Sequence, residues 1–421
     1  MTSSLYFDYA ATTPVDPRVL RAMRPYFGTN FGNPGSLHRF GQEAVAAVDD
    51  ARENIAGAIG ADFREIIFTG SATEANNLAL RGIIKAYRKN FPNPQIMIST
   101  IEHESVRETA HDLAKDGIQV IEIGVDKNGF IDLTALEKAL TPETLLVSIM
   151  YANNEVGTVQ PIKKIAEIIG KFRREHENNI QIRPGSKISK IKLPLFHTDA
   201  VQALQFLPCN VRDLGVDLMT LSAHKIYGPK GTGLLYIRNG ANVAPYITGG
   251  GQEFGIRSGT ENVPQIVGSH EAVKILEKDR EDTKRAIKKL SAYMWEKIKA
   301  MAPKIQLNGP ELGGQKPQSV KDKEGQLERI PNILNIYFPG IRAADLIMKM
   351  DLSGLAVSSG SACTSRSPMP SHVLLALGHP AKRAEQSVRI SLGRTTTKEE
   401  VDSALQIIRQ SLRWNHRKNQ G

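Results

Sequence analysis

The sequence predicts an α/β protein with a large domain, built on a mostly parallel sheet flanked by helices, and a smaller α/β domain after it. Three observations favour this class. From about residue 45 to residue 263, short apolar segments alternate with segments of helical periodicity. After residue 263 the sequence becomes long and charged before strand-like segments return. The length of 421 residues is enough for about two or three packing units.

The first part of the chain supplies the large sheet. Apolar positions recur at helical spacing in residues 44–60 and again in residues 72–90. The expected strands are, in chain order, REIIFTG (64–70), QIMIST (95–100), IQVIEIGV (118–125), LLVSIMYA (145–152), LFHTDAVQ (195–202), VDLMTLSA (216–223) and GTGLLYIR (231–238). This alternation is typical of parallel strands with helices on both faces of the sheet.

The last part of the chain has a different character. Long charged helices are expected at about 265–302, and a polar, glycine-rich stretch at 309–331 reads as a flexible excursion. Three apolar segments then return, at residues 332–338, 355–360 and 387–393, with helical sequence between them. We expect a smaller α/β domain here. The chain has no internal repeats.

The amino-acid composition limits the classes of protein to which the chain can belong. Hydrophobic residues make up 41% and charged residues 23%, as in ordinary globular proteins. Two cysteines cannot form a disulfide framework, which favours a reducing compartment. The start of the chain lacks the pattern of a secretory signal, and no apolar run approaches the roughly 20 residues that span a bilayer. We therefore expect a soluble, cytoplasmic protein with no membrane partner and no metal.

The formal net charge of +10 raises the question of nucleic acid. Most basic runs are mixed with acidic residues, as in 171–179 and 277–290, and such runs are typical of solvated helix faces. Direct nucleic-acid binding is therefore not expected. Residues 183–192 and 413–420 are more one-sidedly basic, so an acidic protein partner or a tRNA stays open.

Residues that could bind a ligand or act in catalysis follow three of the predicted strands. At FTGSATEANN (68–77) a strand runs directly into a helix, so the first backbone N–H groups of that helix and the Thr73 hydroxyl could form an anion cradle. A plain helix N-cap is the alternative. The other two ends carry Asp199 and Lys225, which are 26 residues apart. That spacing fits one strand–helix–strand step, so both side chains should emerge at the ligand-binding edge of the sheet.

A lysine, a carboxylate and an anion cradle in one pocket match the needs of pyridoxal 5'-phosphate. The lysine forms the Schiff base, the carboxylate keeps the pyridine nitrogen protonated, and the cradle holds the phosphate. Each residue by itself could instead be a structural salt-bridge partner.

At this point the sequence resembles a known family, the cysteine desulfurases of the NifS/IscS type within the class V aminotransferase-like enzymes. The matching motifs run nearly end to end: YFDYAATTPVDPRV (6–19), FGNPGSLHRFG (31–41), TGSATEANN (69–77), IEHESV (101–106), NNEVGTVQPI (153–162), HTDAVQ (197–202), SAHKIYGPKG (222–231), RSGTENVPQIVG (257–268), SSGSACTS (358–365) and SVRISLGR (387–394). The resemblance implies the fold-type I architecture of pyridoxal-phosphate-dependent transferases, and a homodimer with its active site near the subunit boundary. It also implies a large cofactor domain at 16–263 and a small domain formed by 1–15 with 264–421.

The same resemblance implies roles for individual residues. Lys225 corresponds to the cofactor lysine and base, Asp199 to the partner of the pyridine nitrogen, and Gln202 to a hydrogen-bond donor for the phenolic oxygen. His103 is expected to stack on the cofactor ring and assist proton transfer. Further cofactor contacts are expected from Ala72, Thr73, Asn154, Ser222, His224 and, from the other subunit, Thr260. Asn154 and Arg389 correspond to substrate-binding positions, with Arg389 pairing with the carboxylate. Without the motifs, a lone histidine would more often be structural and an arginine solvated.

Cys363 lies in AVSSGSACTSRS (356–367), among serines and a glycine rather than apolar residues. Such a polar setting suits a thiol that must become a thiolate, although a chance surface cysteine is the alternative. The resemblance implies that Cys363 takes sulfur from L-cysteine as a persulfide and leaves L-alanine, on a mobile loop at about 356–370. Cys209, in FLPCNV, is expected to be partly buried and structural.

The leading interpretation is a cysteine desulfurase that delivers sulfur to an iron–sulfur scaffold or a tRNA-thiolation factor. Another class V lyase or aminotransferase, for example a selenocysteine lyase, is the alternative enzyme, and a catalytically silent scaffold is the alternative outside enzymes. The sequence departs from the family pattern near 183–195 and 312–330 and ends soon after its last helix, where relatives often continue with a scaffold-docking segment. The acceptor of the sulfur therefore stays open.

Overall fold

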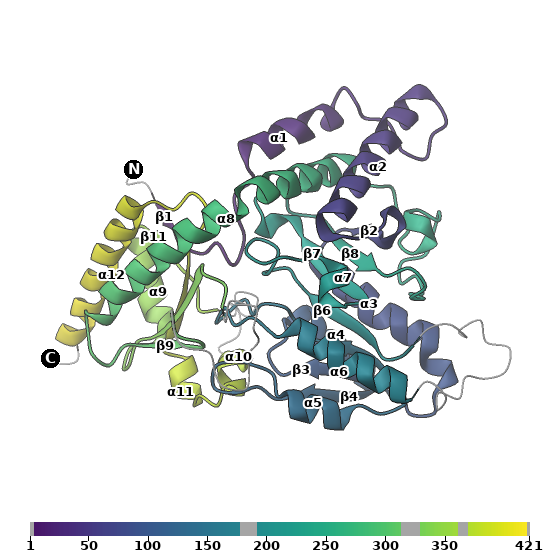
Figure 1. Ribbon diagram of the computed structural model, residues 1–421. Coiled ribbons are helices and arrows are strands. Elements are labelled where there is room, and N and C mark those ends of the chain that lie inside the picture. The colour runs from purple at the N-terminus through teal and green to yellow at the C-terminus, as the bar shows by residue number, and fades with distance from the viewer. Residues whose placement is uncertain (1–3, 177–191, 313–328, 361–368, 419–421) are drawn as a thin grey trace.

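The computed structural model describes residues 4–176, 192–312, 329–360 and 369–418, and a seven-stranded sheet lies at its centre (Figure 1). The strand order is β2-β8-β7-β6-β5-β3-β4. Only β8 runs antiparallel to its neighbours, so the prediction of a mostly parallel sheet is confirmed. The strands are β2 (Ile66–Thr69), β3 (Gln95–Ser99), β4 (Gln119–Ile123), β5 (Thr144–Ser148), β6 (Leu195–Asp199), β7 (Leu218–Ser222) and β8 (Gly233–Ile237).

Helices cover both faces of this sheet because its strands are apolar on both sides. In β2, Ile66 and Phe68 pack into one core with α2 (Arg39–Ile59), α6 (Ile162–Glu175) and α8 (Val263–Lys299). Ile67 points the other way, into a second core with α3 (Ala72–Tyr87) and α4 (Glu104–Lys115). The remaining helices of this region are α1 (Pro17–Met23), α5 (Leu133–Ala139) and α7 (Val211–Leu214).

A second, smaller group of strands and helices follows α8 in the chain. The sequence suggested several charged helices at about 265–302, whereas the structure has a single helix of 37 residues that runs from the large sheet to the C-terminal part (Figure 1). There an antiparallel sheet has the order β12-β10-β9. Its strands are β9 (Gln306–Asn308), β10 (Ile333–Tyr337) and β12 (Ser387–Ser391), and its helices are α9 (Ala343–Leu352), α10 (His372–Ala376), α11 (Ala381–Ala384) and α12 (Lys398–Lys418).

The N-terminal segment joins the two parts. Strand β1 (Leu5–Tyr6) pairs in parallel with β11 (Leu355–Ala356), and Asp8 bridges to Ser391 of β12. Further along, Thr13 and Asp16 hydrogen-bond to the turn after β7. The first residues therefore lie against the C-terminal sheet and then pass to the large sheet. The division at residues 16 and 263 stays a prediction.

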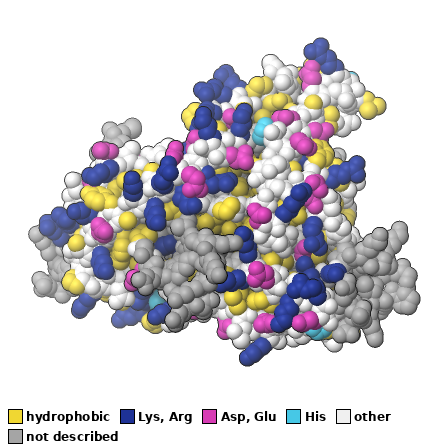
Figure 2. All heavy atoms as spheres, in the orientation of Figure 1, with side chains coloured by type: hydrophobic (Ala, Val, Ile, Leu, Met, Phe, Trp, Pro, Cys, Tyr) yellow, Lys and Arg dark blue, Asp and Glu magenta, His cyan; other side chains and the backbone are white. Residues whose placement is uncertain are grey.

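The visible surface mixes charges of both signs: Figure 2 shows lysine and arginine side chains interspersed with aspartate and glutamate on the described part of this face. One basic residue in the run 171–179 is not on a solvated face, contrary to the expectation for that run. Arg173 is largely buried, pairs with the buried Asp217 and donates from Nε to the carbonyl of Pro194 at 2.9 Å. None of the helices within the described ranges combines the length and the apolar character that crossing a membrane requires.

Candidate active site

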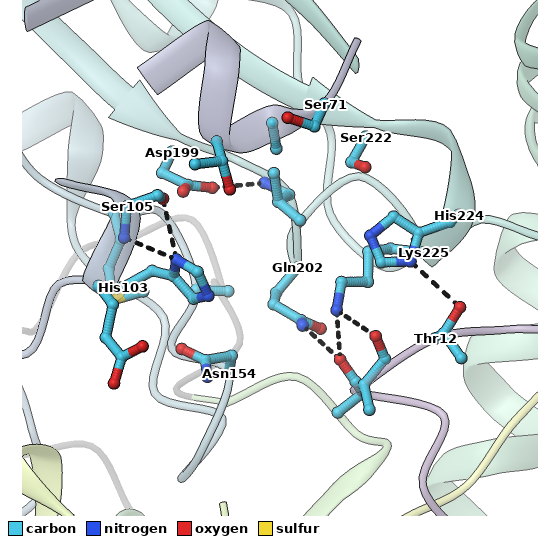
Figure 3. Close-up of a pocket in the computed structure, with 18 of the residues that line it drawn as sticks. Thr12, Ser71, His103, Ser105, Asn154, Asp199, Gln202, Ser222, His224 and Lys225 are labelled. Atoms are coloured by element: carbon cyan, nitrogen blue, oxygen red, sulfur yellow. Dashed lines mark hydrogen bonds between the residues drawn. The ribbon is translucent and has the colours of Figure 1, made fainter. Parts of the chain in front are cut away.

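A cavity of about 450 Å³ opens at the carboxyl edge of the large sheet. Parallel strands bring their carboxyl ends together there, and β6 and β7 end at residues 199 and 222. Most of the site residues predicted from the sequence line this cavity: Ala72, Thr73, His103, Asn154, Asp199, Gln202, Ser222, His224, Lys225 and Arg389 (Figure 3).

Two predicted residues are not among them. Thr260 lines a second hollow of about 170 Å³, whose wall shares Gly231 and Thr232 with the first cavity. Cys363 lies outside the described residues. Gly360, three positions before it in the chain, does line the first cavity.

Lys225 follows β7 on a short 3-10 turn (Ala223–Lys225). Its Nζ donates to the carbonyls of Ala10 and Ala11 at 2.7 and 2.6 Å, and Gln202 Nε2 donates to the Ala10 carbonyl at 2.9 Å (Figure 3). The N-terminal segment is therefore a wall of the site. Sequence reasoning missed this contribution because main-chain carbonyls leave no residue signature.

The turn that carries Lys225 is held from the N-terminal segment. Tyr227 has a φ of 65°, a left-handed conformation that is uncommon for a large side chain. The Thr13 hydroxyl accepts from the Tyr227 N–H at 2.9 Å and donates to the His224 carbonyl at 3.0 Å. These two bonds compensate for the unusual backbone and fix where the lysine emerges.

Asp199 is buried at the end of β6, with 6% of its surface exposed. Its Oδ1 accepts from the Val201 N–H at 3.0 Å and its Oδ2 from Asn76 Nδ2 at 2.8 Å. A carboxylate has about four acceptor sites, so each oxygen can take a further donor. This arrangement suits a carboxylate that must hold a protonated ring nitrogen.

His103 caps the N-terminus of α4. Its Nδ1 accepts from the Ser105 N–H at 3.1 Å and lies 2.9 Å from the Ser105 hydroxyl. Burial lowers its pKa from the usual histidine value, which favours the neutral ring. Ser105 lines the cavity, and the buried Asn76 donates to Ser105 and to Asp199 from behind it. Neither was predicted, although they stand inside the matched segments TGSATEANN and IEHESV.

The expected anion cradle lies where α3 begins. Ser71 is the N-cap, accepting from the Glu74 N–H at 3.1 Å, and it also lines the cavity with the two residues that follow. The N-cap interpretation is therefore confirmed, and the role of these residues as an anion cradle stays a prediction. Strand β8 packs tightly behind this turn, since a Cβ on Gly233 would lie 2.4 Å from the Ser71 carbonyl carbon. His224, opposite, has its pKa lowered to about 4, first by burial and then by the charge of Lys225.

Arg389 lies on β12 with 2% of its side chain exposed. Its Nη1 donates to the carbonyls of Asn154 and Gly360 at 2.9 and 3.1 Å, and its Nη2 to Asp8 Oδ1 at 2.9 Å. Its Nε is buried and has no hydrogen-bond partner among the described residues. Three of the five guanidinium N–H donors are thus used, which leaves Nε–H and one Nη2 proton; the role of Arg389 toward a substrate stays a prediction.

Two buried glutamates border the site and were not predicted. Burial raises the pKa of Glu102 to about 8, and its Oε1 accepts from the Ser99 hydroxyl and the Met150 N–H. Burial also raises the pKa of Glu155, which accepts from the Ser371 hydroxyl at 2.6 Å. The burial of these two glutamates could not be predicted from the sequence, because glutamates in folded proteins are mostly exposed.

The residues present fit pyridoxal 5'-phosphate. The wall combines an amine, a buried carboxylate with acceptor capacity, a helix N-terminus and a neutral imidazole around one cavity large enough for a cofactor. Residues 71–73 with Ser222 and His224 would hold the phosphate, Asp199 the ring nitrogen and Gln202 the phenolic oxygen.

Comparison with known proteins agrees with this chemistry. The family model described as Aminotransferase class-V matches residues 5–174 and 182–404. The cysteine desulfurase IscS of Dictyoglomus turgidum is 41% identical over 410 residues, covering 97% of this chain and 94% of that protein. The cysteine desulfurase IscS of Klebsiella pneumoniae is 43% identical over 418 residues, covering 98% and 93%.

Solved structures give the same result. A NifS-like protein superimposes with a TM-score of 0.84 at 35% identity, covering 98% of this chain and all of that one. A structure of SspA in complex with cysteine superimposes with a TM-score of 0.74 at 33% identity, covering 94% of this chain and 100% of that one. The chain belongs to the class V aminotransferase family and, within it, to the pyridoxal-phosphate-dependent cysteine desulfurases.

Proposed function

We propose that this chain takes sulfur from L-cysteine onto Cys363 as a persulfide and releases L-alanine. The observation that carries the proposal is that the cavity holding Lys225 and Asp199 is also lined by Gly360. Three residues of extended chain span at most about 11 Å, so the length of chain between Gly360 and Cys363 allows the Cys363 thiol to reach an amino acid bound in the cavity.

Several residues of this chain have separate roles in the proposed reaction. When bound, pyridoxal 5'-phosphate supplies an aldehyde that condenses with amines and a ring that withdraws electrons from the substrate α-carbon. Asp199 holds the ring nitrogen protonated. Lys225 would hold the cofactor through its amine and would take the substrate α-proton as a base. Arg389 and Asn154 orient the substrate carboxylate.

Sulfur transfer itself needs no external oxidant or reductant. The Cys363 thiolate attacks the substrate sulfur, a new S–S bond forms, and the substrate C–S bond breaks. Protons then complete the methyl group of alanine, so that an enzyme thiol and L-cysteine become an enzyme persulfide and L-alanine. His103, neutral and next to the cavity, is placed to assist these proton movements.

The test compares alanine and sulfide release from L-cysteine, with a thiol reductant, for the wild type, Cys363→Ser and Cys209→Ser. Wild type should release the two products in equal amounts, and Cys363→Ser neither. Cys209 is the matched control, because it is buried and burial raises its pKa to about 12. Wild-type rates in Cys363→Ser, or loss of activity in Cys209→Ser alone, would contradict the proposal.

We also propose that the active enzyme is a homodimer in which Thr260 contacts the cofactor phosphate of the partner subunit. Thr260 lies beside, not in, the cavity of its own subunit. Mixed dimers of a Lys225→Ala chain and a Thr260→Ala chain test this. If Thr260 acts across the interface, one site in each mixed dimer carries both defects and the other carries neither. Activity should then be recovered on mixing, and no recovery would contradict the arrangement.

The proposed destination of the sulfur is an iron–sulfur scaffold protein or a tRNA-thiolation factor. A persulfide is a suitable donor because a second thiolate can attack its outer sulfur. Radioactive sulfur loaded on the wild type from labelled L-cysteine should move to the cysteines of such an acceptor. Label that stays on this chain with both kinds of acceptor would contradict the assignment.

A further inference from the structure

Four side chains beside the cavity form a hydrogen-bonded row in the order Asp199, Asn76, Ser105 and His103, and Figure 3 labels Asp199, Ser105 and His103 of this row. Asn76 Nδ2 donates to Asp199 Oδ2 at 2.8 Å and to Ser105 Oγ, also at 2.8 Å. The Ser105 hydroxyl lies 2.9 Å from His103 Nδ1. Asn76 comes from α3, Ser105 from α4 and Asp199 from β6, so the row also ties three elements together.

The direction of each bond in the row is determined. A backbone N–H can only donate, so the Ser105 N–H at 3.1 Å requires an unprotonated Nδ1 on His103. Asn76 gives a proton to the Ser105 hydroxyl oxygen, which leaves the single hydroxyl proton for Nδ1. His103 Nδ1 is therefore an acceptor that the Ser105 N–H and the Ser105 hydroxyl share.

Asn76 has only one workable orientation. Turning its amide over would place Oδ1 against the Asp199 carboxylate, which accepts and does not donate. In the orientation found, both amide protons are used, and Oδ1 is buried with no partner among the described residues. An unpaired buried carbonyl oxygen is costly, and the bond to Asp199 compensates for it.

The charged groups around the His103 ring shift its pKa in both directions. Burial lowers the pKa of His103 most strongly, and the charge of Lys225 and then His372 lowers it further. Asp199 and Glu104 raise it. The net direction is downward, so the neutral ring predominates and its one proton belongs to Nε2.

We infer that Asn76 and Ser105 are positioning residues that hold His103 as the Nε2–H tautomer and couple its orientation to that of Asp199. The inference rests on the proposed function for its chemical meaning: His103 meets the cofactor and substrate as a hydrogen-bond donor in its resting state. Neither residue touches the reacting atoms in this arrangement.

The experiment uses holoenzyme labelled with ¹³C and ¹⁵N in histidine, with the His103 signals identified by their loss in His103→Gln. The wild-type ring should show an unprotonated Nδ1 and a protonated Nε2. Ser105→Ala should raise the His103 pKa by about half to one unit, because a donor to the neutral ring is lost. The neutral tautomer should persist, since the backbone N–H remains. Ser105→Thr should restore the wild-type pKa.

Two further variants separate this role from a general effect on the fold. Thr109→Ala removes another buried hydroxyl of α4, bonded to the Ser105 carbonyl at 2.8 Å, and should leave the ring unchanged. Asn76→Ala should shift the His103 pKa upward by less than Ser105→Ala does. A wild-type ring with its proton on Nδ1, or an unchanged pKa in Ser105→Ala, would overturn the inference. A wild type that released no alanine would contradict the proposed function alone, because the readout is the ring itself.

Discussion

At the scale of single residues, the site is unusual for the number of ionisable groups that it buries. His103, Glu102 and Glu155 all have pKa values shifted toward the neutral form, and burial is the largest cause in each case. Charge is then concentrated on the few groups that the chemistry uses. Clusters of this kind are typical of functional sites.

Glu102 gives a pH dependence that can be tested. Its pKa is about 8 in the fold against 4.5 as the reference value, so the folded state retains a proton that the unfolded state has lost. Stability from this group is therefore present at low pH and lost as pH rises toward 8. Glu102→Gln keeps the shape and cannot ionise, and it should gain stability relative to wild type by roughly 2–4 kcal/mol between pH 5 and pH 8.

Urea unfolding of both proteins at several pH values measures this difference. A constant gap between wild type and Glu102→Gln from pH 5 to pH 8 would show that Glu102 is ionised in the fold over the whole range.

Arg389 gives a prediction about substrate binding. Arg389→Lys keeps the charge but cannot reproduce the planar set of donors to Asp8, the Asn154 carbonyl and a carboxylate. The KM for L-cysteine should rise about tenfold or more, with a smaller effect on kcat, because a carboxylate contact is made equally in ground and transition states. Steady-state kinetics check this. A fall in kcat at unchanged KM would contradict a carboxylate contact that is made equally in the ground and transition states.

At the scale of helices and strands, the main feature is the close packing of β8 against the start of α3, where the anion cradle is predicted. Gly233→Ala would place a Cβ 2.4 Å from the Ser71 carbonyl carbon and 2.6 Å from the Ala72 nitrogen. Both atoms belong to backbone, so β8 and the start of α3 must separate. We expect a loss of roughly 1–3 kcal/mol in stability and at least tenfold weaker retention of pyridoxal 5'-phosphate, measured by dialysis and absorbance.

Gly57→Ala is the matched control. Gly57 lies within α2 and no atom approaches its would-be Cβ within 4 Å. Alanine there should stabilise the helix by about 0.5–1 kcal/mol without changing cofactor retention. Equal cofactor retention in Gly233→Ala and Gly57→Ala would contradict the role given to the packing of β8.

The helices and strands also show how much of the structure could be predicted from the sequence. The strands of the large sheet were located because each is a short apolar run that ends in a turn, and β6 and β7 placed Asp199 and Lys225 correctly. Motifs supplied the other predicted residues that line the cavity. The carbonyls of Ala10 and Ala11 were not predictable, because any residue could present them. The Asn76–Ser105 pair depends on how α3 and α4 pack, which periodicity does not encode.

At the scale of the whole molecule, the N-terminal segment links the lysine turn to the C-terminal sheet. Asp16 caps α1 and accepts from Arg18, and it also pairs with Arg394, which stacks on the Tyr227 ring at 4.3 Å. Tyr227 is in the lysine turn. Residues more than 370 positions apart in the chain therefore meet at one carboxylate.

Asp16→Asn should weaken this link. The hydrogen bond from Arg18 is the largest cause that holds the pKa of Asp16 well below its usual range, so its stabilisation is fully present above the ordinary aspartate pKa and shrinks as pH falls below about 4. We expect Asp16→Asn to cost roughly 1–3 kcal/mol at pH 7 and pH 5 and less at pH 3.5. Glu137→Gln breaks an exposed pair with Lys171 and should cost much less than Asp16→Asn at pH 7 and pH 5, because water screens such a pair. Denaturant unfolding at the three pH values measures both variants, and a cost for Asp16→Asn no larger than that of the control would show that the N-terminal link does not stabilise the molecule.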